Sequence, residues 1–237
     1  MLYYGNLKMN IPTDEYISGL TKIDKKENEL SVALPFPYIC KYANALKDAS
    51  INVGAQNVTD TLVKESTGEV SAEMLLDVGA TFTIVGHSER RRFKGETNAK
   101  IREKCQIALE KGLKVILCVG ETREDYENGN TSKVLERQLK DILNTTNAIN
   151  TDNFIIAYEP VWAIGTGLVP SVDEIEVVVR HIKSMAEKWA KCDLKVLYGG
   201  SCKPKNAKML KGVNKLDGFL IGGAFLSCSE LQRIINA

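Results

Sequence analysis

Three side chains capable of acid–base or cationic chemistry follow short apolar runs in this sequence. Lys8, His87 and Glu159 stand where the first, fourth and sixth of these runs end. A carboxylate and an imidazole are common proton carriers in enzymes, and an ammonium can hold an anion or form a Schiff base. Together the three residues predict a site that moves protons on a small anionic compound.

Glu159 is followed directly by an apolar loop. Pro160 cannot extend a sheet ladder because it has no N–H, and two glycines close the segment. Apolar loop side chains need a surface to cover, so we predict a lid over the carboxylate. The alternative is a buried loop packed on the core, with Glu159 in a structural ion pair. The predicted lid comprises Pro160, Val161, Trp162, Ala163, Ile164, Gly165, Thr166 and Gly167.

The lysine and the histidine also have purely structural explanations. A lysine such as Lys8 is most often a solvated surface charge, and only its place at a strand end favours a site. The chain has two histidines. His181 lies in the middle of an expected helix and is expected to face solvent. His87-x-Glu89 resembles part of a zinc deaminase signature, but the Pro-Cys-x-x-Cys partner is absent, so no metal site is expected.

Two glycine-containing turns follow the last two apolar runs. The first ends at Ser201 and the second contains Gly222 and Gly223. Loops at these places in (β/α)8 barrels often bind phosphate through backbone N–H groups and a helix N-terminus. The alternative is a pair of tight strand-to-helix turns. Ser201 has no evident histidine partner in the sequence, so no nucleophile triad is predicted.

The elements that must position these residues alternate regularly. Eight short apolar runs are each followed by a turn and then by a segment with helical spacing. The expected strands are residues 2–7, 30–34, 51–54, 81–85, 113–119, 154–158, 194–197 and 216–221. The expected helices are residues 13–21, 38–49, 72–78, 98–111, 131–143, 171–191, 204–211 and 230–236.

The runs are mostly apolar rather than alternating, as expected of parallel strands buried on both faces. Eight strand–helix units in 237 residues predict an α/β protein in which residues 1–237 form a single-domain (β/α)8 barrel. An open doubly wound sheet is the rival, but residues 5–10 contain no G-x-G-x-x-G turn. In a barrel the loops after the strands gather on one face, so the chemical side chains would converge there.

Composition excludes several classes of function. The formal charge is +1, from 31 basic and 30 acidic residues, so no polybasic nucleic-acid surface is predicted. Six cysteines form no C-x-x-C pair and match no zinc or disulfide framework, which indicates reduced thiols and a cytoplasmic protein. The first residues do not have a signal-peptide pattern, and no run approaches the ~18 apolar residues of a membrane span.

Seven motifs, in the same order and over nearly the whole chain, resemble those of triosephosphate isomerases. The most specific are His87-Ser-Glu-Arg-Arg91 and Ala157-Tyr-Glu-Pro-Val-Trp-Ala-Ile-Gly-Thr-Gly167. The others are Asn6-Leu-Lys-Met-Asn10, Gly54-Ala-Gln-Asn57, Ser71-Ala-Glu-Met74, Tyr198-Gly-Gly-Ser201 and Leu220-Ile-Gly-Gly-Ala224.

The resemblance implies a TIM barrel that interconverts dihydroxyacetone phosphate and D-glyceraldehyde 3-phosphate through an enediolate, without a cofactor. It implies that Glu159 is the base and that His87 is the electrophile. It implies that Lys8 and Asn6 hold the substrate and that Glu89 pairs with Lys8. The phosphate would be bound by N–H groups of Gly165, Ser201, Gly222 and Gly223.

The resemblance also implies a homodimer in which Thr67 approaches the other subunit's site. The sequence departs from the family in this loop, because Glu65-Ser66 precede Thr67 where a Gly-Ala-Phe stretch is usual. Leu7 replaces an aromatic residue between Asn6 and Lys8, which would affect packing below the lysine. Leu168 and Val169 stand at the rear hinge of the lid and would tune its opening rate.

Two other functions fit parts of the pattern. A Schiff-base aldolase would use Lys8 as its nucleophile. A barrel without catalysis would serve as a binding or scaffold protein, but such a chain is expected to have lost Glu159, His87 or Lys8. All three are present.

Overall fold

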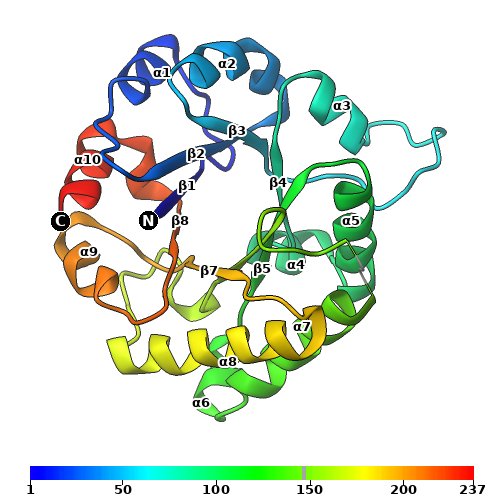
Figure 1. Cartoon of the computed structure of the whole chain (residues 1–237), viewed down its shortest axis with the longest axis vertical. Coiled ribbons are helices and arrows are strands. Elements are labelled where there is room, and N and C mark those ends of the chain that lie inside the picture. The colour runs from blue at the N-terminus through cyan, green and yellow to red at the C-terminus, as the bar shows by residue number, and fades with distance from the viewer. Residues whose placement is uncertain (146–147) are drawn as a thin grey trace.

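The computed structural model describes residues 1–145 and 148–237. Eight parallel strands pair in chain order and close into a barrel, because β8 pairs with β1 (Figure 1). The strands are β1 (Leu2–Asn6), β2 (Glu29–Leu34), β3 (Asn52–Ala55), β4 (Phe82–Val85), β5 (Lys114–Val119), β6 (Phe154–Tyr158), β7 (Lys195–Tyr198) and β8 (Gly218–Ile221). The predicted (β/α)8 barrel is confirmed.

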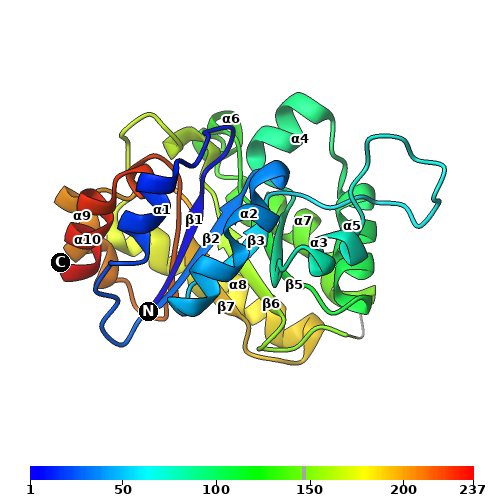
Figure 2. The ribbon, with the colours of Figure 1, turned by 90° about the horizontal axis from the view of Figure 1, so that it is seen from above.

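Helices form a ring outside the strands (Figures 1 and 2). They are α1 (Asp14–Leu20), α2 (Phe36–Asp48), α3 (Ala72–Asp77), α4 (Ser88–Lys94), α5 (Asn98–Glu110), α6 (Arg123–Glu127), α7 (Thr131–Thr145), α8 (Val172–Ala190), α9 (Pro204–Lys211) and α10 (Cys228–Asn236). Two 3-10 turns, η1 (Val161–Ala163) and η2 (Gly223–Leu226), follow β6 and β8. None of the described helices is long and apolar enough to cross a membrane.

Each strand buries one set of side chains inside the barrel and the alternate set under the helices. Tyr4 and Ile155 belong to the inner cluster, whereas their neighbours Tyr3 and Ile156 belong to the outer one. Successive side chains of a strand point to opposite faces, and here both faces are apolar. This is why the runs look continuously apolar in the sequence.

The inside of the barrel is filled by side chains. Tyr4 and Phe82 meet edge to face with ring centroids 5.1 Å apart. A Cβ on Gly54 would lie 2.5 Å from the Phe82 ring, so glycine makes room for this packing. The interior is therefore a core, and a ligand must bind at an end of the barrel.

Two helices were not expected from the sequence. Helix α4 buries only Ser88, and α6 buries no residue. Short charged helices carry no apolar stripe, so hydrophobic spacing cannot reveal them. In addition, α10 begins two residues earlier than predicted, because Ser227 caps it by accepting from the N–H of Glu230.

In helix α8 the predicted capping box is confirmed, whereas the predicted exposure of His181 is wrong. The capping box is present, since Ser171 and Glu174 each accept the other's backbone N–H. His181, which was expected to face solvent, is only partly exposed, and its Nε2 is buried without a hydrogen-bond partner in the described structure.

Candidate active site

The polar and glycine residues that follow the strands meet in one cavity of about 290 Å³ at the carboxyl end of the barrel. This size lies near the lower end of the range for small-molecule sites, which begins at about 300 Å³. All of the predicted catalytic and substrate-binding residues line it, namely Asn6, Lys8, His87, Glu159, Gly165, Ser201, Gly222 and Gly223.

Glu159 is the buried carboxylate of this cavity, with only 2% of its surface exposed. The backbone N–H of Ser88 donates to its Oε2 at 3.0 Å. Nε2 of His87 lies 3.1 Å from its Oε1. A carboxylate this deeply buried is costly unless polar groups face it, and these two contacts supply them.

His87 caps the N-terminus of α4 with its own side chain. The N–H of Glu89 donates to Nδ1 of His87 at 3.2 Å. Because Nδ1 accepts this bond, it is unprotonated, and the proton of the neutral imidazole is on Nε2. The ring therefore presents an N–H, next to Glu159, at the site.

Arg91 holds the turn that carries His87. Its Nε donates to the carbonyl oxygen of Gly86 at 2.8 Å, its Nη2 to that of Cys118 at 3.0 Å and its Nη1 to Oδ1 of Asn98 at 2.7 Å. Burial lowers the pKa of Arg91, and the negative charge of Glu159 is among the groups that oppose this. The guanidinium thus links the ends of β4 and β5 to the start of α5.

Lys8 has a strained backbone, with φ at 51° in the left-handed region. Such a conformation costs about 1–3 kcal/mol for a residue other than glycine and is common at functional sites. The N–H of Lys8 donates to Oδ1 of Asn6 at 2.9 Å, which partly offsets the strain. Its Nζ lies 2.5 Å from Oε1 of Glu89. Glu89 is therefore the ion-pair partner of the lysine and stands outside the cavity itself.

The opposite wall of the cavity is made by the loops after β7 and β8. In the described chain, the N–H groups of Gly165, Ser201 and Gly223 donate no hydrogen bond, and η2 starts at this wall. Lys203 also lines the cavity and adds a positive charge that was not predicted. Its only signal in the sequence was a basic residue two positions after Ser201.

The predicted lid crosses the mouth of the cavity only in part. Ile164 and Gly165 line the cavity, whereas Trp162 points elsewhere and donates from Nε1 to Oε1 of Glu121 at 2.8 Å. Gly165 and Gly167 have φ of 72° and 80°, which favours glycine. Within the described structure, no hydrogen bond joins residues 161–169 to the loops after β7 and β8. The segment predicted to be a lid is therefore attached on the side of Glu121.

Glu121 is a fully buried carboxylate that was not predicted. It also accepts a hydrogen bond from the hydroxyl of Tyr158 at 3.1 Å, while its Oε2 has no partner in the described structure. Burial raises the pKa of its carboxyl, and the bonds from Trp162 and Tyr158 only partly counteract this. Glu121 follows β5 as an acidic residue in a loop, and nothing in the sequence distinguishes it from an exposed one. Its burial could therefore not be predicted.

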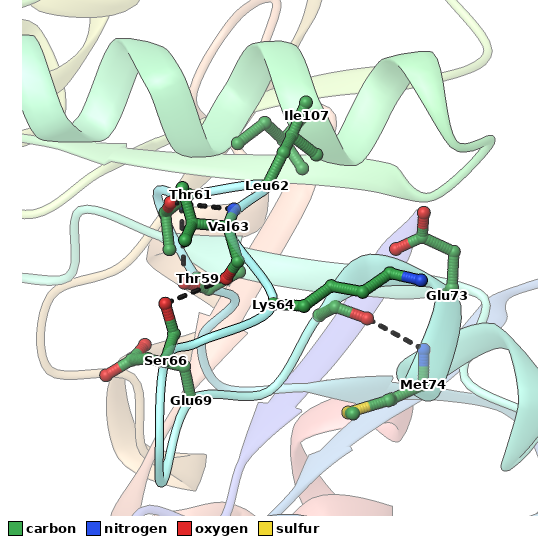
Figure 3. A pocket seen from close by; sticks show the side chains of 11 residues that line it. Thr59, Thr61, Leu62, Val63, Lys64, Ser66, Glu69, Glu73, Met74 and Ile107 are labelled. Atoms are coloured by element: carbon green, nitrogen blue, oxygen red, sulfur yellow. Dashed lines mark hydrogen bonds between the residues drawn. The ribbon is translucent and has the colours of Figure 1, made fainter.

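Thr67 does not belong to this cavity. It lies exposed on the arm, which we define as residues 57–71, and the arm projects from the barrel (Figures 1 and 2). A larger cavity of about 520 Å³ lies under the arm, between it and Ile107 of α5 (Figure 3). It contains no histidine and no buried acid, so it is not a candidate for acid–base chemistry. No group of three metal-ligating side chains occurs among the residues described.

A closed (β/α)8 barrel with a buried carboxylate, a neutral imidazole and an ammonium around one cavity defines an enzyme of the acid–base class. The family model of triosephosphate isomerase matches residues 1–237, and the chain belongs to this family. The resemblance seen in the motifs is thereby confirmed.

Curated relatives support the same assignment. The chain is 41% identical over 243 residues to the triosephosphate isomerase of Herminiimonas arsenicoxydans, an alignment that covers 100% of this chain and 98% of the relative. It is 40% identical over 245 residues to that of Porphyromonas gingivalis, with 98% and 97% covered. It is 37% identical over 240 residues to that of Alkaliphilus oremlandii, with 98% and 97% covered.

Proposed function

We propose that this protein interconverts dihydroxyacetone phosphate and D-glyceraldehyde 3-phosphate, as its family membership indicates. Residues 1–237 would form one catalytic domain, which needs no cofactor. The enzyme would act in the cytoplasm, in glycolysis and gluconeogenesis. The observation that carries the proposal is the 3.1 Å distance between Nε2 of His87 and Oε1 of Glu159 inside a cavity that also contains Lys8.

Glu159 would act as the base. It would turn from Ser88 toward the substrate, take a proton from the carbon next to the carbonyl and return it to the neighbouring carbon. His87 would donate its Nε2 proton toward the carbonyl oxygen, and a neutral imidazole in this role is already established for the family. Lys8 and Asn6 would stabilise the negative charge of the enediolate, since fixed donors and a cation lower such a barrier.

The substrate phosphate would lie against the loops after β7 and β8. The N–H groups of Gly165, Ser201, Gly222 and Gly223 would bind it, and Lys203 would add a cation. Closure of the lid would exclude water and strengthen these interactions, and it would protect the enediolate from losing phosphate.

The arm supports a homodimer. Leu62 and Val63 on the arm are 62% and 61% exposed, and Met74 beside it is 58% exposed (Figure 3). A cavity of about 440 Å³ beside the site, which includes the 96% exposed Met9, would receive the arm of a second copy. Thr67 would then approach the other subunit's site. Sedimentation velocity of the purified protein tests this, and a monomer at micromolar concentration would exclude it.

A Schiff-base aldolase fits the structure less well. Nζ of Lys8 is paired with the carboxylate of Glu89, whereas a Schiff base needs an unpaired amine that faces the substrate carbonyl. Borohydride added in the presence of substrate would trap a covalent adduct at Lys8 only in the aldolase.

A coupled assay tests the proposed isomerase directly. Purified protein is given D-glyceraldehyde 3-phosphate, and dihydroxyacetone phosphate is detected by its reduction with NADH. The reverse direction is followed with a dehydrogenase specific for the aldehyde. Absence of turnover in both directions, from protein that is folded by circular dichroism, would exclude the function.

A further inference from the structure

One side chain of the short helix α6 contacts both the first part of the lid and the first turn of α8, the helix that follows the lid. The ring of Tyr126 packs on the indole of Trp162 with centroids 4.4 Å apart and planes inclined by 31°. Its hydroxyl donates to Oε1 of Glu174 at 2.5 Å. We propose that Tyr126 is a positioning residue that fixes the two roots of the lid, an inference that rests on the function proposed above.

The first root is the segment around Trp162. The indole is held at its edge by Glu121, which accepts from Nε1 at 2.8 Å, and on its face by the Tyr126 ring. The backbone is held as well, because the N–H of Val161 donates to the carbonyl oxygen of Glu121 at 3.1 Å. Without Tyr126 the indole would keep its edge contact and lose the aromatic contact on its face.

The second root is the start of α8. Oε2 of Glu174 accepts from both the N–H and the hydroxyl of Ser171, each at 2.7 Å, and this capping box sets where the helix begins. The other oxygen of the same carboxylate accepts from Tyr126. The hydrogen bond from Tyr126 is the main cause that lowers the pKa of Glu174, in agreement with the tyrosine as donor.

The two contacts limit what the lid can do. Between the roots lie residues 163–170, and the glycines with positive φ, Gly165 and Gly167, lie within this span. Tyr126 contacts Trp162 directly and reaches Ser171 through Glu174, so closure is confined to the segment between these two residues. This restriction raises the fraction of time in which the lid is closed over a bound phosphate, because fewer open conformations compete.

Variants of Tyr126 separate the two contacts. Tyr126→Phe keeps the ring on Trp162 and removes the bond to Glu174, whereas Tyr126→Leu removes both. Arg123→Ala is the matched control, because Arg123 lies on the same helix and its side chain pairs, among the described residues, only with the exposed Glu127. If the loss of any side chain from α6 disturbed the lid, Arg123→Ala would alter lid closure in the same way as the tyrosine variants.

The kinetic readout is the coupled assay together with inhibition by 2-phosphoglycolate, whose carboxylate mimics an enediolate. Apparent affinity scales with the population of the binding-competent state, so a tenfold loss of closed lid weakens 2-phosphoglycolate by about tenfold. We expect Tyr126→Leu to reduce kcat/KM and this affinity in parallel. Tyr126→Phe shows a smaller loss of both, and Arg123→Ala stays within about twofold of wild type.

Hydrogen exchange of the free protein gives a readout that needs no activity. The N–H groups of Val161, Ala163 and Ile164 are hydrogen-bonded at the first root. Tyr126→Leu should speed their exchange while leaving the arm unchanged. If wild type has no isomerase activity but this acceleration appears, the proposed function fails and the role of Tyr126 stands.

The proposal is overturned if wild type is active and both tyrosine variants keep wild-type kcat, KM, 2-phosphoglycolate affinity and lid exchange. A fall in melting temperature alone would also overturn it, because that outcome belongs to a purely structural side chain. If Tyr126→Leu does not fold, Tyr126→Phe decides by the same criteria.

Discussion

Nε2 of His87 and Oε1 of Glu159 lie 3.1 Å apart, although the two residues follow different strands, β4 and β6. The N–H of Glu89 donates to Nδ1 of the same ring, so the proton of the neutral imidazole is on the nitrogen next to the carboxylate. A buried carboxylate and the N–H of a neutral imidazole are therefore adjacent.

Shortening the base should remove turnover. Glu159→Asp withdraws the carboxylate by one methylene, and a misplacement of about 1 Å can cost on the order of 10²-fold in rate. We expect kcat to fall by at least that factor, while 2-phosphoglycolate still binds. Steady-state kinetics and inhibition measure the two effects. Turnover close to wild type would exclude Glu159 as the base.

Removing the imidazole should slow the chemical step. His87→Gln should reduce kcat by about 10²–10⁴-fold, the usual contribution of a positioned proton donor. The control is His181→Gln, which changes the other histidine on α8, outside the cavity. If both variants lose activity equally, the loss reports general damage and the assigned role of His87 is wrong.

Arg91 should matter for both stability and rate. Arg91→Met leaves the carbonyl groups of Gly86 and Cys118 without a donor, and each unsatisfied buried group costs about 1–3 kcal/mol. We expect a loss of a few kcal/mol in urea unfolding and a lower kcat, because the turn before His87 loosens. Arg92→Met, at the adjacent exposed position, is the control and should change neither.

The ion-pair cluster of Glu96 should make stability depend on pH. Burial tends to raise the pKa of this carboxyl, but hydrogen bonds and charges from Lys104 and Arg90 outweigh it, so the pKa is lowered. The stabilisation is therefore fully present above the unfolded-state pKa of about 4.3 and is lost as pH falls through the lower folded-state value.

Glu96→Gln isolates this contribution. At pH 7 it leaves the buried Lys104 without its charge partner, which should cost about 3–5 kcal/mol. In urea titrations the difference from wild type should shrink as the pH falls below about 4.3, since wild type then loses the same interaction. A difference that stays constant from pH 7 to pH 3 would contradict the assignment.

Sequence reasoning succeeded where local pattern decides the structure. The apolar runs marked all eight strands, with ends displaced by at most two residues, and Ser171 with Glu174 marked the start of α8. It failed at α4 and α6, which are short, charged and almost without buried side chains. A helix that buries so little produces no periodic signal, and its neighbours decide whether it forms.

What the sequence by itself determined was the chemistry and its order along the chain. The residue types at Lys8, His87 and Glu159, each after an apolar run, indicated proton transfer, and eight such runs indicated the barrel that gathers them. These features are local, because strand burial and turn chemistry depend on residues a few positions apart.

Only the tertiary structure decided which partners hold those groups. The tautomer of His87, the three acceptors of Arg91 and the attachment of Trp162 to Glu121 and Tyr126 were not evident from spacing. The hydrogen bond of Trp162 to Glu121 and that of Tyr126 to Glu174 join residues 41 and 48 positions apart. Closure of the barrel brings such residues together at one face, and no local periodicity encodes which of them will meet.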